Sequence, residues 1–405
     1  MSFQQPELLI CGKRFFERLA ESIRTAQISI IVNMFIWRND ELGVALALLL
    51  LNAADRGVRI SICKDRYGVI LECCEENCAS FFHNRMTLGE KAQSFCLKHL
   101  YRLAMPSATV PQNIVDRLRR HPNIRIDDNH YRRDHSKFWI FDDKTLYLGG
   151  INVENKEKDA DNRGYIYHDY MVCLQGREIV EAFLAKRQNP AQVSQMFGMN
   201  LKTPAQCFEM RERYLSLIQN AKQTLDILMA YFAPEEDFLD EIASACKRGV
   251  KVRLLLPQNA NFNHHLNMLT AYRLLGNIDR NLNIFLSPKM VHAKVLVNEK
   301  ILSLGSCNIN RKTFCSLDEL NLFWPNDSRS FASSLRENIE SLFQEAHLVK
   351  SRQQLHVNWL WAAAEHVIMQ VIGCFSPPQK NATPPCLDPP SPCARNIHAP
   401  IRSSC

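Results

Sequence analysis

Two short runs of the sequence place a histidine two residues before a lysine, and a Gly-x-x-Asn turn follows each run. The first run is His135–Lys137, which leads to Asn152, and the second is His292–Lys294, which leads to Asn308. The histidine-to-asparagine spacing is 152 − 135 = 17 residues in the first copy and 308 − 292 = 16 in the second. A single pair of this kind is common on protein surfaces, but two copies at nearly equal spacing indicate a functional site.

These residue types suit phosphoryl transfer on a phosphodiester. Two lysines supply positive charge for the non-bridging oxygens, and two asparagine amides add neutral donors. One imidazole can attack phosphorus, while the other protonates the leaving alkoxide and later takes a proton from the incoming alcohol or water. A two-step path through a phosphohistidine explains why two histidines are needed. Because the lysine pair already neutralises the phosphate, we predict no metal and no other cofactor.

Repeated elements position the two runs. Residues two apart on a strand face the same side, so the histidine and lysine of each run share one face. The surrounding pattern is strand, helix, strand in both halves, which implies right-handed crossovers and parallel pairing. We therefore predict an α/β protein with two related domains, residues 1–200 and 201–350. The elements behind this prediction are strands at 28–37, 58–62, 224–232 and 250–256, and helices at 41–54, begun by Asp40 and ended by Gly57, and at 236–247, ended by Gly249.

Composition excludes several classes of protein. The chain has 405 residues, of which 46% are apolar and 22% charged, so it is not mainly disordered, fibrous or a small disulfide scaffold. Its net charge of +7 fits an anionic partner, either a lipid surface or nucleic acid. The N-terminus has no secretory signal pattern, which favours reduced thiols in the cytosol. Cys73, Cys74 and Cys78 lack a second CxxC or paired histidines, so they indicate ordinary thiols rather than zinc ligands.

The character of the chain changes after residue 350. Residues 357–375, within a segment at 351–375, predict one helix that is apolar on most faces, with Trp359 and Trp361 near its start. It is too short and polar to span a bilayer, and two interpretations stay open: a helix at a membrane interface, or a terminal helix packed on the second domain. Residues 376–405 are rich in proline and predict a disordered tail.

The two runs resemble the phospholipase D superfamily, whose signature is HxKxxxxD followed by a GSxN-like turn, present twice. Here the runs extend to Asp142 and Glu299, so the resemblance implies a catalytic set of His135, Lys137, Asp142, His292, Lys294 and Glu299. In that family the two copies pack about a pseudo-twofold axis, so the resemblance implies tandem α/β/α sandwich domains with both histidines at one phosphate. The segments that resemble the bacterial cardiolipin synthases in particular are 34–37, 54–58, 230–234 and 305–311.

The resemblance also implies roles for single residues. The first histidine, His135, is expected to be the nucleophile and His292 the acid and base. Asp169 and Glu319 fall where the family keeps an acid that orients a catalytic histidine, although solvated carboxylates at strand ends are the alternative. Ser306 is expected to support the phosphate site.

Two positions depart from the family pattern. Glu299 stands where the family has Asp, which shifts a mainly structural carboxylate by one methylene group. Gly150 replaces the usual Ser of the first turn, which removes one hydroxyl donor.

The expected activity is that of a phosphatidyltransferase, peripheral at the cytoplasmic face of the cell membrane. The donor is expected to be phosphatidylglycerol or a related phospholipid, and the acceptor a second lipid alcohol, at an anionic membrane surface. Hydrolysis by a phospholipase D, a superfamily nuclease and an inactive lipid-binding scaffold remain as alternatives. A run of arginines at positions 117–133 suits either lipid headgroups or a nucleic-acid backbone. No particular oligomeric state is predicted.

Overall fold

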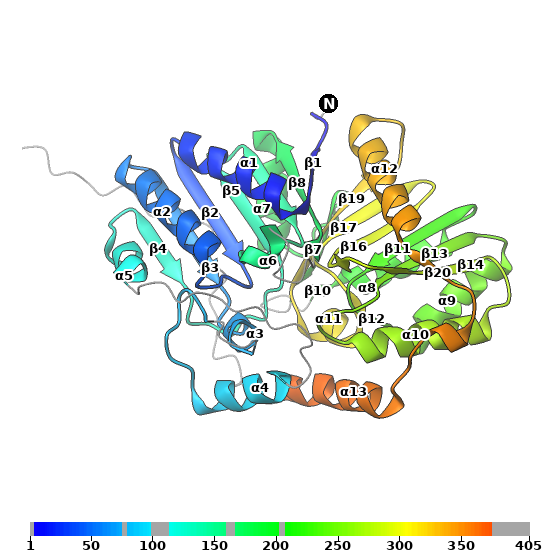
Figure 1. Ribbon diagram of the computed structural model, residues 1–405. Helices are drawn as coiled ribbons and strands as arrows, with labels where there is room; N and C mark the ends of the chain where they lie inside the picture. The colour runs from blue at the N-terminus through cyan, green and yellow to red at the C-terminus, as the bar shows by residue number, and fades with distance from the viewer. Residues whose placement is uncertain (1–3, 75–78, 99–112, 159–166, 202–206, 375–405) are drawn as a thin grey trace, which may run out of the picture.

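Two β-sheets form the centre of the molecule, and each is built mainly from one half of the sequence (Figure 1). The computed structural model describes residues 4–74, 79–98, 113–158, 167–201 and 207–374, with the backbone alone for 369–374. Cys78 and the tail predicted at 376–405 therefore lie outside the described residues.

The first sheet has seven strands in the described part of the chain, in the spatial order β1 (Glu7–Ile10), β8 (Tyr170–Gln175), β6 (Thr145–Gly149), β5 (Lys137–Phe141), β2 (Ser29–Met34), β3 (Arg59–Lys64) and β4 (Ile124–Asp127). The second sheet has nine among the described residues, in the order β10 (Cys207–Phe208), β9 (Phe197–Leu201), β19 (Glu319–Pro325), β17 (Ile301–Gly305), β16 (Lys294–Asn298), β11 (Thr224–Met229), β13 (Lys251–Pro257), β14 (Leu282–Ser287) and β20 (His347–Val349).

The two sheets repeat one pairing pattern. Strand β2 pairs in parallel with β3 and antiparallel with β5, and β11 pairs in the same way with β13 and β16. The antiparallel order continues through β6 to β8 in one sheet and through β17 to β19 in the other. The predicted parallel units are therefore confirmed, and each is extended by three antiparallel strands, the first of which begins at the lysine of the His-x-Lys run.

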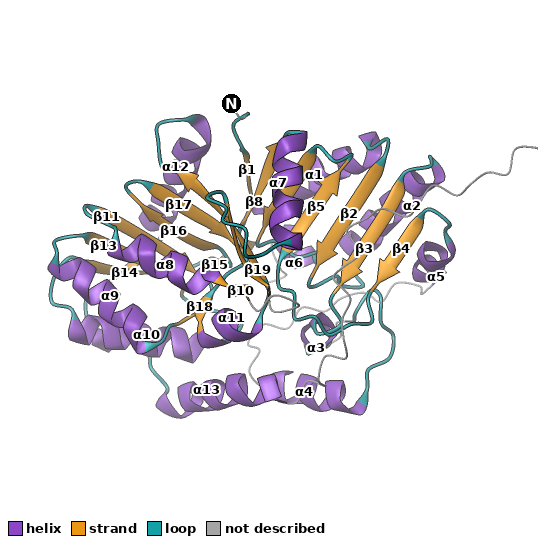
Figure 2. Ribbon diagram, turned by 180° about the vertical axis from the view of Figure 1, so that it is seen from behind, coloured by secondary structure: helices purple, strands orange, loops and turns teal. Residues whose placement is uncertain are grey.

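Helices cover both faces of each sheet (Figure 2). One apolar core lies between the first sheet and α1 (Cys11–Thr25), α2 (Glu41–Asp55) and α5 (Asn113–Arg120). A matching core lies between the second sheet and α8 (Glu209–Gln219), α9 (Glu236–Lys247) and α10 (His264–Asn277). A third core is shared by the two sheets with α7 (Arg177–Gln188) and α12 (Ser330–Glu345). The predicted fold class, two α/β/α sandwiches in tandem, is confirmed.

Local chemistry explains the boundaries of the predicted helices. The side chain of Asp40 accepts a hydrogen bond from the Gly43 N–H and begins α2. Gly57 and Gly249 have φ angles of 96° and 93°, a conformation that favours glycine and ends α2 and α9. Because β9 belongs to the second sheet, we propose that the second domain begins just before residue 197 rather than at 201.

Short elements complete the fold around the carboxyl ends of β2 and β11. They are α3 (Gly68–Glu72), α4 (Leu88–Lys98), α6 (Asn155–Lys158), β7 (Tyr167–His168), β12 (Phe232–Ala233), β15 (Met290–Val291), β18 (Ile309–Asn310), α11 (Arg311–Ser316), a 3-10 turn at Arg352–Gln354 and α13 (Trp359–Cys374). The helix predicted at 357–375 is thus observed as α13. Within the described residues, no helix combines the length and the apolar character that crossing a membrane requires.

Candidate active site

His135 and His292 line the same small pocket, which lies between the two halves of the chain. The pocket has a volume of about 100 Å³ and also exposes the side chains of Asn152 and Asn308 to its interior. The two histidines and two asparagines that the repeated spacing singled out are therefore brought together, although they come from separate domains.

Backbone hydrogen bonds between the halves hold the histidines in place. The His135 N–H donates to the carbonyl of Asp318 at 2.9 Å, and the His292 N–H donates to the carbonyl of His168 at 2.8 Å. Each carbonyl belongs to the residue directly before an acid, Glu319 in one case and Asp169 in the other. The short parallel pair of β7 and β15 extends the second contact. Each histidine is therefore fixed in register with the acid of the opposite half.

The same crossing continues in the side chains. Nδ1 of His135 lies 3.1 Å from both carboxylate oxygens of Glu319, and Nδ1 of His292 lies 2.9 Å from Oδ2 of Asp169. Because an acid of the opposite half lies against Nδ1 of each ring, Nε2 is the atom left available to a substrate. Asp169 and Glu319 are buried against the histidines, so the alternative of solvated strand-end carboxylates is wrong.

The two lysines lie beneath the histidines and not on the pocket wall. Nζ of Lys137 donates to the carbonyl of His135 at 2.5 Å, and Nζ of Lys294 donates to the carbonyl of His292. Lys294 also lies 3.7 Å from Oδ2 of Asp169. Both amino groups are buried directly under the pocket, where each adds positive potential when it is protonated.

Burial and these charges control protonation at the site. Burial, together with the charges of Lys137 and Lys294, holds the pKa of both histidines well below the ordinary value. Burial also lowers the pKa of Lys137 to about 7 and raises the pKa of Glu319 to about 8. Both imidazoles are therefore neutral in the empty pocket near pH 7, the form in which Nε2 can attack an electrophile.

The asparagines are buried with unsatisfied hydrogen-bonding capacity. Among the described residues, neither Oδ1 of Asn152 nor Oδ1 of Asn308 has a hydrogen-bond partner, and both side chains are nearly inaccessible. Buried amides without partners are uncommon because desolvation costs about 1–3 kcal/mol per group. Their placement on the pocket wall indicates that a polar ligand completes their bonding.

The two turns before these asparagines differ in a way the structure explains. In the second half, the Ser306 hydroxyl donates to Oε2 of Glu319 at 2.5 Å and accepts the N–H of Leu320. In the first half, a Cβ atom on Gly150 would lie 2.3 Å from Oδ2 of Asp169. The aspartate carboxylate fills the space that a serine would need, which accounts for the glycine.

Asp142 and Glu299 lie at the far end of their strands from the histidines and do not reach the pocket. Asp142 accepts backbone N–H groups of residues 27–29 at 2.7–3.2 Å. Glu299 accepts those of Lys222 and Gln223 at 3.0 and 3.3 Å. Each acid follows a five-residue strand that is by itself roughly 16 Å long, and its histidine lies before the start of that strand. We therefore propose that the two acids anchor the starts of β2 and β11, apart from the reacting groups.

A further acid near His292, Glu157, was not predicted from the sequence. Oε1 of Glu157 lies 3.6 Å from Nδ1 of His292, is buried, and has no hydrogen-bond partner in the described part of the chain. Burial, with the charges of Glu154 and Asp169, raises its pKa well above the ordinary value. The place of Glu157 in the sequence, shortly after Asn152, indicates that it could lie near the site. Nothing in the sequence shows that Glu157 rather than Glu154 turns toward the histidine.

Two aromatic rings near the histidines, one after β2 and one after β11, were not predicted from the sequence. The Phe35 ring lies 4.8 Å from the His135 ring, and the Tyr231 ring lies 5.9 Å from the His292 ring, between centroids. Both belong to the segments quoted for the family resemblance, 34–37 and 230–234, which was a signal for their position near the site.

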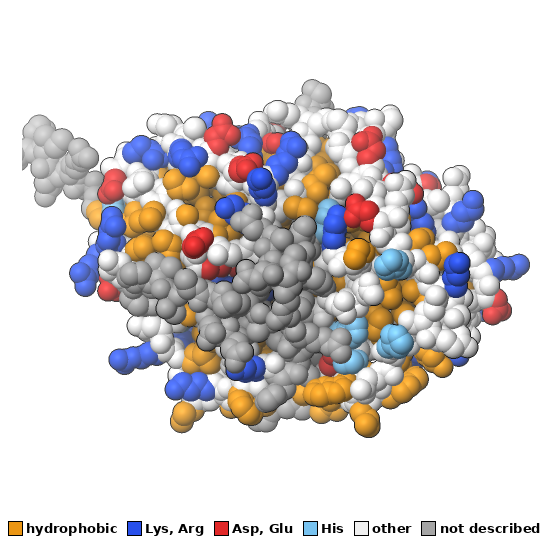
Figure 3. All heavy atoms as spheres, viewed as in Figure 1, with side chains coloured by type: hydrophobic (Ala, Val, Ile, Leu, Met, Phe, Trp, Pro, Cys, Tyr) orange, Lys and Arg blue, Asp and Glu red, His pale blue; other side chains and the backbone are white. Residues whose placement is uncertain are grey.

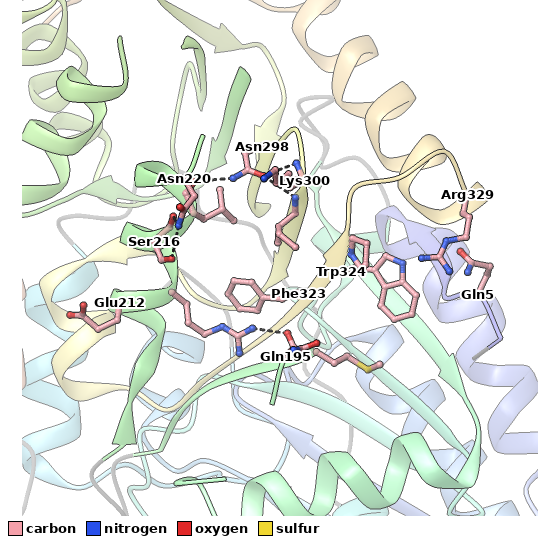
Figure 4. Close-up of a pocket in the computed structure, with 15 residues that line it drawn as sticks. Gln5, Gln195, Glu212, Ser216, Asn220, Asn298, Lys300, Phe323, Trp324 and Arg329 are labelled. Carbon is pink, nitrogen blue, oxygen red and sulfur yellow. Dashed lines mark hydrogen bonds between the residues drawn. The ribbon is translucent and has the colours of Figure 1, made fainter. Parts of the chain in front are cut away.

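A second and larger pocket lies at the opposite end of the second sheet (Figure 4). Its volume is about 1180 Å³, and its walls include Phe323 and Trp324 of β19, Ser216 of α8, and Asn298 and Lys300 at the β16–β17 turn. Since β16 begins beside His292 and ends at Asn298, this pocket lies a full strand length from the histidines. Size alone therefore does not identify the reacting site here.

Comparison with known proteins agrees with the geometry. Residues 214–343 match the family described as "Cardiolipin synthase, PLD-like domain". The chain is 23% identical over 370 residues to the major cardiolipin synthase ClsA of Bacillus subtilis, covering 85% of this chain and 69% of that protein. It is 25% identical over 365 residues to cardiolipin synthase B of Salmonella typhi, covering 84% and 80%.

A solved structure supports the fold. The crystal structure of a phosphatidylserine synthase from Haemophilus influenzae superposes with a TM-score of 0.64 at 15% identity, covering 93% of this chain and 94% of the other. The resemblance predicted from the sequence is therefore confirmed: residues 214–343 match a phospholipase D-like domain, the chain is similar to bacterial cardiolipin synthases over most of its length, and its two-domain fold is that of the phosphatidylserine synthase.

Proposed function

We propose that this protein is a phosphatidyltransferase of the cardiolipin synthase type, which moves a phosphatidyl group between phospholipids through a phosphohistidine intermediate. The observation that carries the proposal is the crossed pair of histidines in one pocket, each held by an acid of the opposite half. The similarity to cardiolipin synthases supports lipid substrates, with phosphatidylglycerol or a related phospholipid as donor.

In the first step, Nε2 of His135 attacks the phosphorus of the donor lipid, and the bond from phosphorus to the glycerol oxygen breaks. Nε2 of His292 gives its proton to the departing alkoxide, and Nδ1 takes over the proton that Asp169 and Glu157 hold in the empty pocket. The cluster of His292, Asp169 and Glu157 can hold that proton because burial raises the pKa of both acids. Lys137 and Lys294 stabilise the negative charge on the phosphate oxygens.

In the second step, a lipid hydroxyl gives its proton to His292 and attacks phosphorus, and the bond from phosphorus to His135 breaks. The enzyme returns to its starting protonation state. Water in place of the lipid alcohol yields phosphatidic acid, so phospholipase D hydrolysis is the same chemistry with another acceptor.

The surroundings of the pocket favour a lipid over a nucleic acid. Apolar side chains line it beside the histidines, among them Leu71, Leu97 and Phe262. Of the arginines predicted to attract an anionic polymer, Arg119 is paired with Asp128 and Arg132 is buried against Asp127. We accordingly place the protein at the cytoplasmic membrane face, where it meets an anionic lipid surface as a peripheral protein.

A two-substrate assay tests this function. Purified protein is given phosphatidylglycerol vesicles in one tube and labelled single- and double-stranded DNA in another, and products are followed by mass spectrometry. We expect cardiolipin and glycerol in equal amounts, and no product from H135A. The matched control is H130A, because His130 lies in the same half but bonds to Asp127 outside the pocket. Cut DNA with unchanged lipid would overturn the proposal in favour of a nuclease, and no product from either substrate would favour a scaffold.

A further inference from the structure

Two helices far apart in the sequence lie end to end along one edge of the molecule, below both sheets in Figure 1. They are α4 and α13, which contact each other where the end of α4 meets α13. Figure 2 shows the same arrangement from behind. The sequence predicted α13 but not α4, and only the fold brings the two helices together along this edge.

Both helices turn apolar side chains outward. On α4 the exposed positions include Leu88, Ala92 and Phe95, and on α13 they include Leu360, Ala363 and Val367. The spacings of three and four residues place each set on one helix face. Leu88 and Leu360 are 85% and 84% exposed, which is unusual for leucine on an ordered helix. Orange side chains along the lower edge of Figure 3 show the same band.

Buried acids fix the orientation of these helices. Glu90 of α4 turns inward and binds Arg66 through both carboxylate oxygens, at 2.8 and 3.2 Å. Glu365 of α13 turns inward and accepts the N–H groups of His265 and Leu266 in the first turn of α10, at 3.3 and 2.8 Å. Each apolar face therefore points outward because the opposite face is held by hydrogen bonds.

The charge of this edge has one sign in the described residues. Lys91 and Lys98 are exposed on α4, whereas the acids of the two helices, Glu90 and Glu365, are buried. An apolar band flanked by cations complements an anionic lipid surface, which offers acyl chains and negative headgroups together.

The edge is continuous with the wall of the reacting pocket. Leu97, on the inner face of α4, lines the pocket that holds His135 and His292. It packs in one apolar cluster with Phe35 and Phe262, and Ile368 of α13 packs against that cluster. A bilayer that met the outer face of these helices would lie next to the pocket.

We propose that α4 and α13 together form a docking ridge that lies in the headgroup region of an anionic bilayer and holds the pocket at the lipid surface. The ridge is defined by Leu88, Ala92, Phe95, Trp359, Leu360, Ala363 and Val367, with Lys91 and Lys98 beside them. The proposal rests on the proposed lipid substrate and adds which surface of the molecule faces the membrane.

Tryptophan fluorescence gives a direct readout. The chain has five tryptophans; Trp37, Trp139 and Trp324 are buried, whereas Trp359 and Trp361 are 56% and 45% exposed on α13. We expect a blue shift, and protection from acrylamide, when vesicles of phosphatidylglycerol and phosphatidylcholine are added to the wild-type protein. Emission that stays unchanged while the protein sediments with the vesicles would overturn the ridge.

Substitutions at the two most exposed leucines locate the contact. We expect L88E and L360E each to weaken binding to these vesicles roughly tenfold or more, since each removes one inserted leucine. The matched control is V193E, because Val193 is 89% exposed but lies away from the ridge, before β9. Binding of L88E and L360E equal to that of V193E would overturn the proposal, and so would a lipid-free dimer that both variants disrupt.

The design separates the ridge from the proposed reaction. The ridge variants should keep wild-type turnover of a short-chain donor lipid dispersed in detergent, where docking on a bilayer is not needed. If the wild type turns over no lipid but loses vesicle binding through L88E and L360E, the ridge holds and the transferase proposal fails. If product forms on vesicles and the variants bind and react as the wild type does, the ridge fails and the transferase proposal holds.

Discussion

The two halves of the molecule build their share of the site on one plan but with different side chains. The first half supplies Asp169 to His292, and the second half supplies Glu319 to His135. The turn beside each acid changes with it. Gly150 leaves room for the aspartate, whereas Ser306 donates a hydrogen bond to the longer glutamate. This difference shows that the residue in the turn depends on the length of the acid beside it: glycine fits beside aspartate, and serine binds glutamate.

The halves also differ in the number of acids near each histidine. His292 has Asp169 and, 3.6 Å away, Glu157, whereas the Nδ1 of His135 contacts Glu319. A second acid lets the His292 side store a proton, which suits an acid and base. The single acid at His135 suits a nucleophile that stays neutral until it attacks.

Substitution of the two histidines should give the largest effects on turnover and should show that the two halves have different roles. We expect H135A and H292A each to lower turnover of phosphatidylglycerol by about 10³-fold or more. A donor lipid with a p-nitrophenol leaving group needs no protonation, so H292A should release a burst of nitrophenol with it and H135A should not. Equal bursts from both variants would contradict the assigned roles.

Substitutions in the two Gly-x-x-Asn turns should give the next largest losses of turnover, with a larger loss in the first half than in the second. G150A places a methyl group where the Asp169 carboxylate lies, so we expect turnover to fall about 10²-fold because His292 loses its partner. S306A removes one hydrogen bond to Glu319, and we expect a fall of about tenfold. Thermal unfolding checks that both variants are folded. A larger loss for S306A would contradict the packing argument.

The pH dependence of anion binding should come mainly from the His135 side. As pH falls from about 9 to about 6, Glu319, with a pKa raised to about 8, loses its charge, and Lys137, with a pKa lowered to about 7, gains one. Both changes make the pocket more positive, so a phosphonate analogue of the donor should bind more tightly at lower pH. Each proton taken up changes the affinity by up to about tenfold per pH unit.

Calorimetry in buffers of different ionisation enthalpy measures that proton uptake. E319Q should flatten the profile near pH 8, and D142N, remote from the pocket, should leave it unchanged. An affinity that does not change between pH 6 and pH 9 would contradict the protonation states described here.

The anchoring acids should give the smallest effects on activity and a measurable effect on stability. D142N weakens a buried carboxylate that accepts three backbone N–H groups, and we expect a loss of about 2 kcal/mol in the free energy of unfolding. E299Q affects a more exposed acid with two such bonds, and we expect about 1 kcal/mol. Turnover should change less than threefold in both. Urea unfolding measures the change in the free energy of unfolding. A large loss of turnover in either variant would show that these acids take part in the reaction.

Much of the fold follows from the sequence because its strongest signals are local. Asp40, Gly57 and Gly249 mark helix ends through backbone chemistry that needs no distant partner. The alternation in the two His-x-Lys runs predicts one strand face for histidine and lysine, but β5 and β16 begin only at Lys137 and Lys294, and the histidines line the pocket without the lysines. The strand order beyond the parallel units needs tertiary contacts, which local patterns do not encode.

Which residues gather at the candidate site could be predicted from the sequence, but which acid contacts which histidine could not. Repeated spacing identifies the histidines and asparagines, and the family resemblance adds Asp169 and Glu319. The crossing of each acid to the opposite histidine depends on how two domains pack. Glu157 shows the same limit, because the sequence does not distinguish it from Glu154, which pairs with Arg38 and Lys156 instead of approaching His292. The outward face of α4 is visible only when the buried partner of Glu90 is known.

Mapping the covalent intermediate tests the central claim most directly. The protein is mixed with phosphatidylglycerol labelled with ³²P at the phosphate, stopped within milliseconds, digested, and its labelled peptides are sequenced by mass spectrometry. We predict an acid-labile, alkali-stable phosphoramidate, with phosphorus bonded to Nε2 of His135, which is absent in H135A. Label on His292 with none on His135, or product formed in a single step with no labelled histidine, would contradict the claim.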